Sequence, residues 1–267
     1  MGDLRDNFAE NGPLSVEDAE TYAWQLEMPG FGAAEQAVLR NATALVSRVG
    51  GLGGPVAQAL AAAGIGKLVL AHGGNLREDD LNRQILMSRN WLGRSRVECA
   101  RETLRRFNPR IAVEAVDSNV TPENAAELVG KADLVFDCAP LFEERLLMNA
   151  ACVAQDTPLV DCAMFGWEGQ VIPIVPGKTP CLACLYPETP PHWKRRFPVI
   201  GAVSAVIGNL GVIEGIKLLA GMEGSRAGCL VHIDTRTMGM RTVKLKRRVD
   251  CVVCGEGGKV NGQGSTG

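Results

Sequence analysis

Strand-like and helix-like segments alternate along residues 42–163, and this alternation limits the possible fold more than any other feature of the sequence. The first pair is ATALVSRV at residues 42–49, expected as a buried strand, and the helical pattern GPVAQALAAAG at residues 54–64. Strands that alternate with helices over short links form a parallel sheet with helices on both faces. The sequence therefore predicts a Rossmann-like, doubly wound α/β fold. The further expected strands are residues 67–71, 111–117, 132–138 and 157–163, and the further expected helices are residues 94–107, 122–130 and 142–155.

Both ends of the chain differ from this alternating core. Two helices are expected before the first strand, one beginning at Ser15 and one covering about residues 33–40. The segments expected after the core are a strand at residues 168–175, a Pro-, Gly- and Cys-rich loop at 176–198, a long apolar helix from Val199, and an antiparallel hairpin of strands at 228–234 and 240–248. We therefore expect an N-terminal helical segment at residues 1–41, an α/β domain at 42–255 and a disordered tail at 256–267.

Composition and charge exclude several classes of protein. Hydrophobic residues make up 46% of the chain and charged residues 22%, and the formal net charge is −2, so no basic excess favours nucleic acid or an anionic membrane. The N-terminal MGDLRDNFAENGPLS lacks the apolar core of a secretory signal. The long apolar stretch carries Asn209, Glu214 and Lys217, which are costly in lipid, so we expect a buried helix there. A cytoplasmic protein without a nucleic-acid or membrane partner is expected.

Nine cysteines without a secretory signal indicate a reducing compartment, so these thiols need an explanation other than disulfides. Four of them form two C-x-x-C units, Cys181 with Cys184 and Cys251 with Cys254. Two such turns complete a closed, tetrahedral and therefore structural zinc site. Unrelated thiols or a redox pair are the alternatives, and the sequence around them is not thioredoxin-like. The other five cysteines are expected to be buried small residues: Cys99, Cys138, Cys152, Cys162 and Cys229.

The glycine-rich SRVGGLGG at residues 47–54 joins the first strand to the next helix. Gly50, Gly51 and Gly53 leave backbone N–H groups and the helix dipole facing an anion. The dinucleotide pattern G-x-G-x-x-G fails at Val56, and the acid that would bind an NAD ribose is replaced by Gly74. A dinucleotide oxidoreductase is therefore disfavoured. The alternative to a phosphate site is a merely tight strand–helix turn.

Two further motifs carry cations near the expected phosphate loop. DDLNRQILM at residues 79–87 places an arginine beside amides after the second strand, and GRSRVE from Gly93 places arginines at a helix start. Each motif alone has the alternative of an ordinary solvated surface.

Together these motifs resemble the HesA/MoeB/ThiF family, the bacterial relatives of ubiquitin-activating enzymes. The resemblance runs from about Tyr22 to Gly255: YAWQLEMPGFG resembles the family's opening, VGGLGGPVAQALAAAGIGKLVLA its nucleotide loop, LNRQIL its arginine motif, GRSRVE its basic motif, EGIKLLAG its late helix and the double C-x-x-C its zinc site. SRVGGLGG, AHGGN, DCAPLFEER and CLACLYPE look most like the HesA branch.

The resemblance implies ATP-dependent adenylation, with Mg²⁺, of the C-terminal carboxylate of a small ubiquitin-like carrier protein that ends in Gly-Gly. It also implies a homodimer, and the branch implies a role in molybdenum or nitrogenase metal-cofactor or sulfur-carrier biosynthesis. Residues 42–255 would then form the adenylation domain. The alternative is a non-catalytic nucleotide-binding scaffold that assists metal-cofactor maturation.

Carried over by motif, the family's site falls on a defined set of residues. The implied ATP-binding residues are Arg48, Gly50, Gly51, Gly53, Asp80, Arg83, Gln84 and Arg96, and the implied catalytic residues are Arg83, Arg96 and Asp137. Arg96 stands at a lysine position of the family and Asp80 at an asparagine position. Asp137 lies three residues before Pro140, which replaces the aspartate associated with Mg²⁺.

Other positions depart from the family pattern. Thr21 and Trp24 replace arginines, one of which normally reaches the ATP of the partner subunit, and Lys194 replaces the loop cysteine. Arg48 occupies the first glycine position of the phosphate loop. Its side chain is expected either to contact phosphate from its own loop, to reshape the pocket for another ligand, or to pair with a nearby carboxylate.

Overall fold

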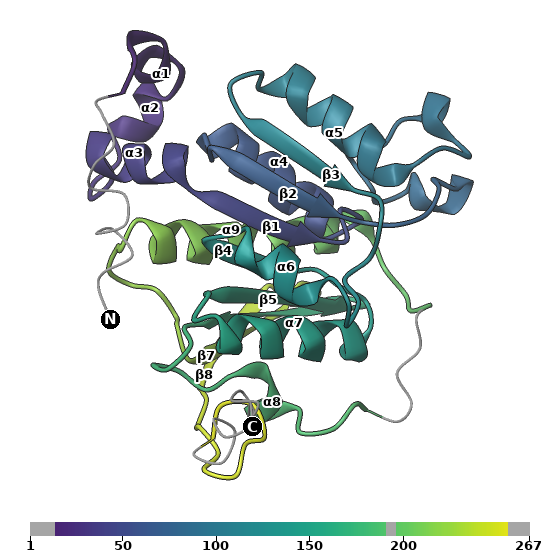
Figure 1. Cartoon of the computed structure of the whole chain (residues 1–267), viewed down its shortest axis with the longest axis vertical. Helices are drawn as coiled ribbons and strands as arrows, with labels where there is room; N and C mark the ends of the chain where they lie inside the picture. Colours follow the sequence, from purple (N-terminus) through teal and green to yellow (C-terminus); the bar gives the residue numbers. More distant parts are fainter. Residues whose placement is uncertain (1–13, 191–195, 256–267) are drawn as a thin grey trace, which may run out of the picture.

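The computed structural model describes residues 14–190 and 196–255. Its centre is a single eight-stranded sheet in the order β3-β2-β1-β4-β5-β6-β7-β8, parallel from β3 to β5 and antiparallel from β5 to β8 (Figure 1). The strands are β1 (Thr43–Ser47), β2 (Lys67–Ala71), β3 (Ala112–Val116), β4 (Leu134–Asp137), β5 (Leu159–Phe165), β6 (Glu168–Ile174), β7 (Cys229–Asp234) and β8 (Gly239–Lys244). The predicted doubly wound α/β fold with C-terminal antiparallel strands is confirmed.

Helices cover both faces of the sheet because alternate strand residues point to opposite sides. In β1, Ala44 and Val46 belong to one apolar cluster and Leu45 to the other. The first cluster takes in α3 (Ala33–Asn41), α4 (Gly53–Ala63), α5 (Arg96–Phe107) and α9 (Gly201–Leu219), and the second takes in α6 (Ala125–Gly130), α7 (Phe142–Ala154) and α8 (Leu182–Leu185). Figure 1 shows α6 and α7 in front of the sheet and α9 behind it. Each face therefore has its own apolar core.

The first expected helix is split into α1 (Val16–Thr21) and α2 (Ala23–Leu26). Ser15 caps α1 as predicted, since its Oγ accepts from the backbone N of Asp18 at 3.0 Å. The split falls at Tyr22, whose hydroxyl accepts a hydrogen bond from Asn108 Nδ2 at 3.1 Å. Tertiary packing of this tyrosine thus overrides the continuous helical pattern.

Three smaller boundaries also differ from the sequence-based expectation. α5 begins at Arg96 rather than at residue 94, because Ser95 Oγ accepts from Glu98 N and caps it there. α6 begins at Ala125 rather than Pro122, because residues 121–124 form a turn. Short unpredicted elements are α8 and two single turns of 3₁₀ helix, Glu78–Asp80 and Arg89–Trp91. The tail expected at 256–267 lies outside the described residues.

The long apolar helix α9 is part of the core. By length and composition alone it could cross a membrane, but half of its most apolar window is buried inside the protein. A Cβ added at Gly211 would lie 2.4 Å from Cys162 Sγ, so glycine permits this helix to pack directly on β5. Its buried Glu214 is hydrogen-bonded by Lys217 Nζ and by the backbone N of Arg226. The expected buried helix is therefore observed.

Candidate nucleotide site and metal centre

A cavity of about 810 Å³ opens at the carboxyl ends of β1 and β4, between which the strand order reverses. In doubly wound sheets such a switch point is where ligands bind. Seven of the sequence-predicted ATP residues line it together: Arg48, Gly50, Gly51, Asp80, Arg83, Gln84 and Arg96. Gly53 does not line the cavity; a Cβ there would lie 2.6 Å from the backbone O of Arg48, so glycine is needed for the turn itself.

The loop after β1 and the start of α4 lie at this cavity. Gly50, Gly51 and Leu52 line it, and α4 begins at Gly53 with no side-chain cap on its first N–H groups. Ser47 Oγ accepts from the backbone N of Cys138 at 3.0 Å, which ties the loop to the end of β4. The start of this 11-residue helix carries partial positive charge, which suits phosphate oxygens, whereas the backbone N of Gly54 already donates to Gly50 O and Pro55 has no N–H.

Arg48 pairs with a carboxylate, which is the third of the alternatives left open for it. Its Nε donates to both carboxylate oxygens of Glu144, at 3.0 and 2.8 Å, and Nη2 donates to Oε2 at 2.6 Å. The two residues are only 7% and 6% exposed. Arg48 has φ 57°, a left-handed conformation uncommon for a non-glycine residue. The pairing does not exclude a ligand contact, because Arg48 also lines the cavity.

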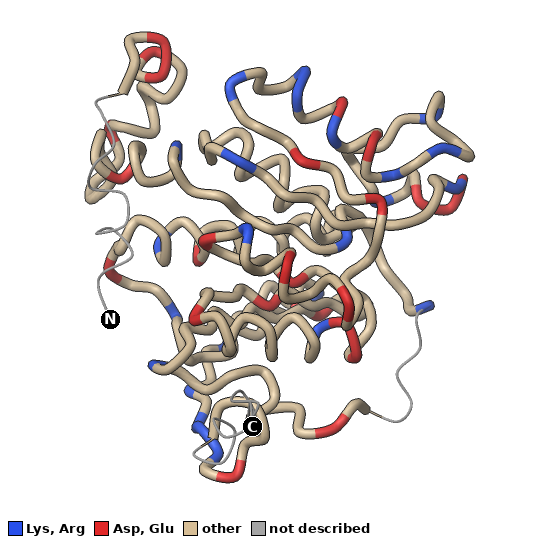
Figure 2. Tube along the Cα trace, viewed as in Figure 1, with Lys and Arg blue, Asp and Glu red and all other residues tan. Residues whose placement is uncertain are grey.

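Asp80 organises the cationic side of the cavity. Its Oδ2 accepts from Arg96 Nε and Nη2 at 3.1 and 2.8 Å, and its Oδ1 accepts from Gln84 Nε2 at 2.8 Å and Arg83 Nη2 at 3.3 Å. Acidic and basic residues accordingly mix along the segment between β2 and α5 (Figure 2). Asp80 is buried, so its geometry favours holding three side chains in place over meeting phosphate directly.

Asp137 does not reach the cavity. It is fully buried, and burial raises the pKa of its carboxyl well above the usual value, against the opposing effect of Arg145. Its Oδ1 accepts from Ala139 N at 2.9 Å, and its Oδ2 lies 3.5 Å from Arg145 Nε. This geometry therefore gives no support to the catalytic role that the resemblance implied for Asp137. Pro140, at the position where the family carries an aspartate, does line the cavity.

Sequence reasoning missed Arg145, which lines the cavity and pairs with Asp137 and with Asp161. A signal was present, since Phe142, Arg145 and Asn149 lie on one helical stripe (i, i+3, i+7) that the apolar pattern places against the sheet. His72 also lines the cavity, and so do Arg196 and Ser204, which were not assigned there from the sequence. Arg196 directly follows residues 191–195, which lie outside the described residues and include Lys194.

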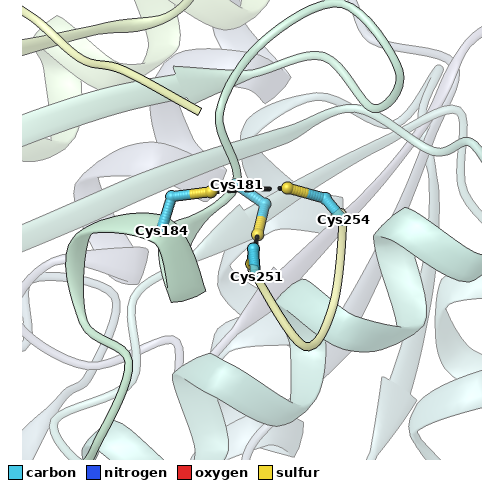
Figure 3. A group of neighbouring side chains, drawn as sticks. All are labelled: Cys181, Cys184, Cys251 and Cys254. Carbon is cyan, nitrogen blue, oxygen red and sulfur yellow. Dashed lines mark hydrogen bonds between the residues drawn. The ribbon is translucent and has the colours of Figure 1, made fainter. Parts of the chain in front are cut away.

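The four predicted zinc ligands lie close together (Figure 3), and two of them, Cys181 and Cys184, belong to the segment of α8, which lies below α7 in Figure 1. Their sulfurs all lie within 4.8 Å of one another, with Cys181 3.7 Å from Cys251 and Cys184 3.4 Å from Cys254. These separations exceed a disulfide bond and match the roughly 3.8 Å that a tetrahedron of 2.3 Å zinc–sulfur bonds requires. The structure thus brings together all four residues of the predicted site.

The surroundings of the cluster fit a bound metal dication. Asn149 Nδ2 is buried without a hydrogen-bond partner among the described residues, and this amide favours the ionised form of Cys181. The backbone N of Arg248 donates to Cys184 Sγ at 3.5 Å. Burial raises the pKa of Cys181 and Cys184. A metal ion would offset that unfavourable burial by stabilising thiolates, which these N–H groups would then support.

The remaining cysteines agree largely with expectation. Cys99, Cys138, Cys152 and Cys162 are buried and Cys229 is half-buried, and none of them forms a disulfide. Cys138 differs in that it lines the cavity. Burial raises the pKa of the Cys138 thiol well above its usual value.

The fold and the cavity define a class of α/β protein with a doubly wound sheet, a glycine-rich loop at the switch point and a cluster of four cysteines. The ThiF family model matches residues 22–253, and the chain belongs to the ThiF family. The heterocyst protein HesA of Trichormus variabilis is 45% identical over 91% of this chain and 91% of its own length.

More distant relatives show how widely the fold is used. The adenylyltransferase and sulfurtransferase MOCS3 of Xenopus laevis is 35% identical over 90% of this chain, which spans 54% of that protein. The crystal structure of E. coli MccB superposes with a TM-score of 0.80 at 21% identity, covering 91% of this chain and 74% of MccB. At that identity the likeness establishes the shared fold.

Proposed function

We propose that this protein binds ATP in the cavity and adenylates the C-terminal carboxylate of a small ubiquitin-like carrier protein ending in Gly-Gly. The observation that carries the proposal is the convergence of the uncapped start of α4 with Arg48, Arg83 and Arg96 around one cavity at the switch point. The relationship to a named adenylyltransferase, MOCS3, supports the reaction class. The pathway, molybdenum or nitrogenase metal-cofactor or sulfur-carrier biosynthesis, rests on the greater likeness to HesA.

In the proposed reaction a carboxylate oxygen of the carrier attacks the α-phosphorus of ATP. The bond from that phosphorus to the bridging oxygen breaks, so pyrophosphate leaves and an acyl-adenylate forms. The protein's part is to align the reactants and to stabilise the charge that develops on phosphate oxygens. Arg83 and Arg96, both held by Asp80, supply cations on one side, and Arg145 supplies one near Pro140.

The cavity fits the phosphates better than it fits a protein-held Mg²⁺. The described carboxylates that line it are Asp79 and Asp80, and both are paired with arginines. Mg²⁺ in such sites is held by one or two carboxylates together with substrate phosphates. We therefore assign no residue of this chain as a dedicated Mg²⁺ ligand, and we propose that the metal is bound chiefly by the nucleotide.

Calorimetric titration of Mg·ATP tests the site. Replacement Arg83→Ala is expected to weaken binding at least about tenfold, which corresponds to about 1.4 kcal/mol. Arg89→Ala is the matched control, because Arg89 belongs to the same segment but pairs with Glu78 at the surface outside the cavity lining. Equal affinities of the two variants for Mg·ATP would show that the nucleotide does not bind in this cavity.

A nucleotide-binding scaffold without catalytic activity is the second candidate. Pro140 at the cavity and the burial of Asp137 favour it, since neither offers the reacting phosphate a carboxylate. Pyrophosphate exchange into ATP in the presence of the carrier separates the two functions. Exchange above the carrier-free background supports adenylation, whereas Mg·ATP binding without exchange supports the scaffold.

We further propose a cytoplasmic homodimer. The family resemblance is the support for the dimer, and nine cysteines without a disulfide agree with a reducing compartment. Sedimentation velocity of the zinc-loaded chain at micromolar concentration tests the dimer, for which a single monomeric species would be the contrary result.

A further inference from the structure

The cavity and the four-cysteine cluster share one helix, α7. Three of its residues, Phe142, Arg145 and Asn149, form a buried stripe along the side that faces β5 and the cysteine loop. Arg145 lines the cavity, and Asn149 Oδ1 accepts from the backbone N of Leu182, which directly follows Cys181, at 2.8 Å. The two sites therefore contact the same helix one turn apart.

A second connection begins at Tyr186, two residues beyond Cys184. Its ring packs edge-on against Phe142 with centroids 4.9 Å apart, and its hydroxyl donates to Gln170 Oε1 at 3.2 Å. Gln170 Nε2 donates to Asp161 Oδ2 at 3.4 Å. Asp161 Oδ1 in turn accepts from Arg145 Nη2. An unbroken series of hydrogen bonds thus runs from the cysteine loop to a guanidinium at the cavity.

The orientation of Arg145 depends on this series. Asp161 accepts a hydrogen bond from Nη2 of the guanidinium, Asp137 Oδ2 lies 3.5 Å from its Nε, and both carboxylates are fully buried. Gln170 is the described hydrogen-bond donor on the second oxygen of Asp161, and Tyr186 fixes the amide of Gln170. Tyr186 itself directly follows α8, a four-residue helix that contains Cys184 and is preceded by Cys181, two members of the cluster.

We propose that Tyr186 is a positioning residue that couples occupancy of the four-cysteine site to the nucleotide cavity by orienting Arg145. The inference rests on the proposed function, because it takes the cavity as the ATP site and the cluster as a zinc site. A filled cluster fixes the loop that carries Tyr186, and the ordered hydrogen bonds then present Arg145 to the phosphates. Linkage makes the effect reciprocal, so Mg·ATP tightens the hold on zinc by the factor by which zinc tightens ATP binding.

The direct test is Tyr186→Phe, which removes one hydroxyl and keeps the ring on Phe142. Tyr22→Phe is the matched control, since Tyr22 is the other tyrosine of the chain and its hydroxyl is also hydrogen-bonded to an amide side chain. At full zinc content and unchanged melting temperature, Tyr186→Phe is expected to weaken Mg·ATP binding about three- to tenfold, the range for loss of one hydrogen bond. Tyr22→Phe is expected to leave the affinity unchanged.

A second variant and a second measurement distinguish the proposed coupling from a general loss of folded structure in Tyr186→Phe. Gln170→Leu interrupts the same series without altering the cysteine loop and is expected to weaken binding as much as Tyr186→Phe. Zinc release to a chromogenic chelator is expected to slow when Mg·ATP is added to the wild-type chain. In both variants this protection should shrink.

The outcomes are distinct. Wild-type binding of Mg·ATP, with unchanged affinity and unchanged protection of zinc in both variants, would overturn the coupling and leave the proposed function standing. Absence of Mg·ATP binding to the zinc-loaded wild-type chain would overturn the proposed function, and the coupling with it. Weaker binding in both variants at full zinc content, with the Tyr22→Phe control unaffected, is the expected result.

Discussion

Replacing Glu144 with alanine is expected to lower the free energy of unfolding by about 3–5 kcal/mol, because it leaves a guanidinium buried without its counter-ion. Arg48 and Glu144 form three hydrogen bonds to each other and both lie inside the protein. Removing one partner of such a pair is far more damaging than removing both. Urea denaturation of the zinc-loaded chain, followed by circular dichroism, measures the change.

The control for this experiment is Glu143→Ala. Glu143 precedes Glu144 in the first turn of α7 and is exposed. The control therefore removes the same charge near the helix N-terminus but leaves the Arg48–Glu144 ion pair intact. A loss well below 1 kcal/mol is expected there. Equal effects of the two substitutions would show that Arg48 finds solvent or another partner, and that the pair contributes little.

The double variant Arg48→Gly, Glu144→Ala separates stability from ligand binding. It removes both charges and also relieves the left-handed backbone at φ 57°, which costs about 1–2 kcal/mol for a residue with a side chain. Its stability is therefore expected to recover most of the loss. If the double variant folds but no longer binds Mg·ATP, Arg48 is a phosphate ligand. If it binds Mg·ATP more tightly than the wild-type chain, the Arg48–Glu144 pair narrows the cavity.

Local patterns predicted the fold well because they depend on neighbours in sequence. The buried strand ATALVSRV and the helix after it follow from apolar periodicity and the glycine turn, and the structure places β1 and α4 there. The two C-x-x-C units were equally informative, because each brings two thiols together within one turn. Tyr22 shows the limit, since a contact with Asn108, 86 residues away in sequence, divides a continuous helical pattern.

The charge pairs of the site could not be predicted in the same way. Glu144 lies 96 residues from Arg48, and only the packing of α7 against the sheet brings the two together. Asp137 lies three residues before the family's aspartate position, so the sequence suggested a catalytic role for it. At the end of β4, however, its side chain is fully buried and lies next to Arg145. Residue type indicated chemistry in each case, whereas the direction of the side chain was a tertiary property.

Removal of zinc is the second change with a large expected effect. The cluster joins segments 70 residues apart, and β8, which leads to Cys251 and Cys254, is an edge strand with every residue exposed. Besides the cysteines, Leu245 and Val253 pack against the second apolar cluster, and Arg247 donates to Cys254 O. Because these contacts are few, metal–thiolate bonds are expected to supply much of the stability of the last segment. Cys254→Ser is expected to reduce bound zinc from about one per chain to almost none.

The same variant is expected to lower the melting temperature by about 10 °C or more, since a loss of several kcal/mol shifts a domain of this size by 2–4 °C for each kcal/mol. Cys229→Ser is the matched control, because Cys229 is a half-buried free thiol at the start of β7 and lies outside the cluster. Metal analysis with scanning calorimetry checks both. If wild-type protein purified without chelator contains no zinc, the metal site is refuted. Equal melting temperatures of the two variants would show that protein contacts alone hold the last segment in place.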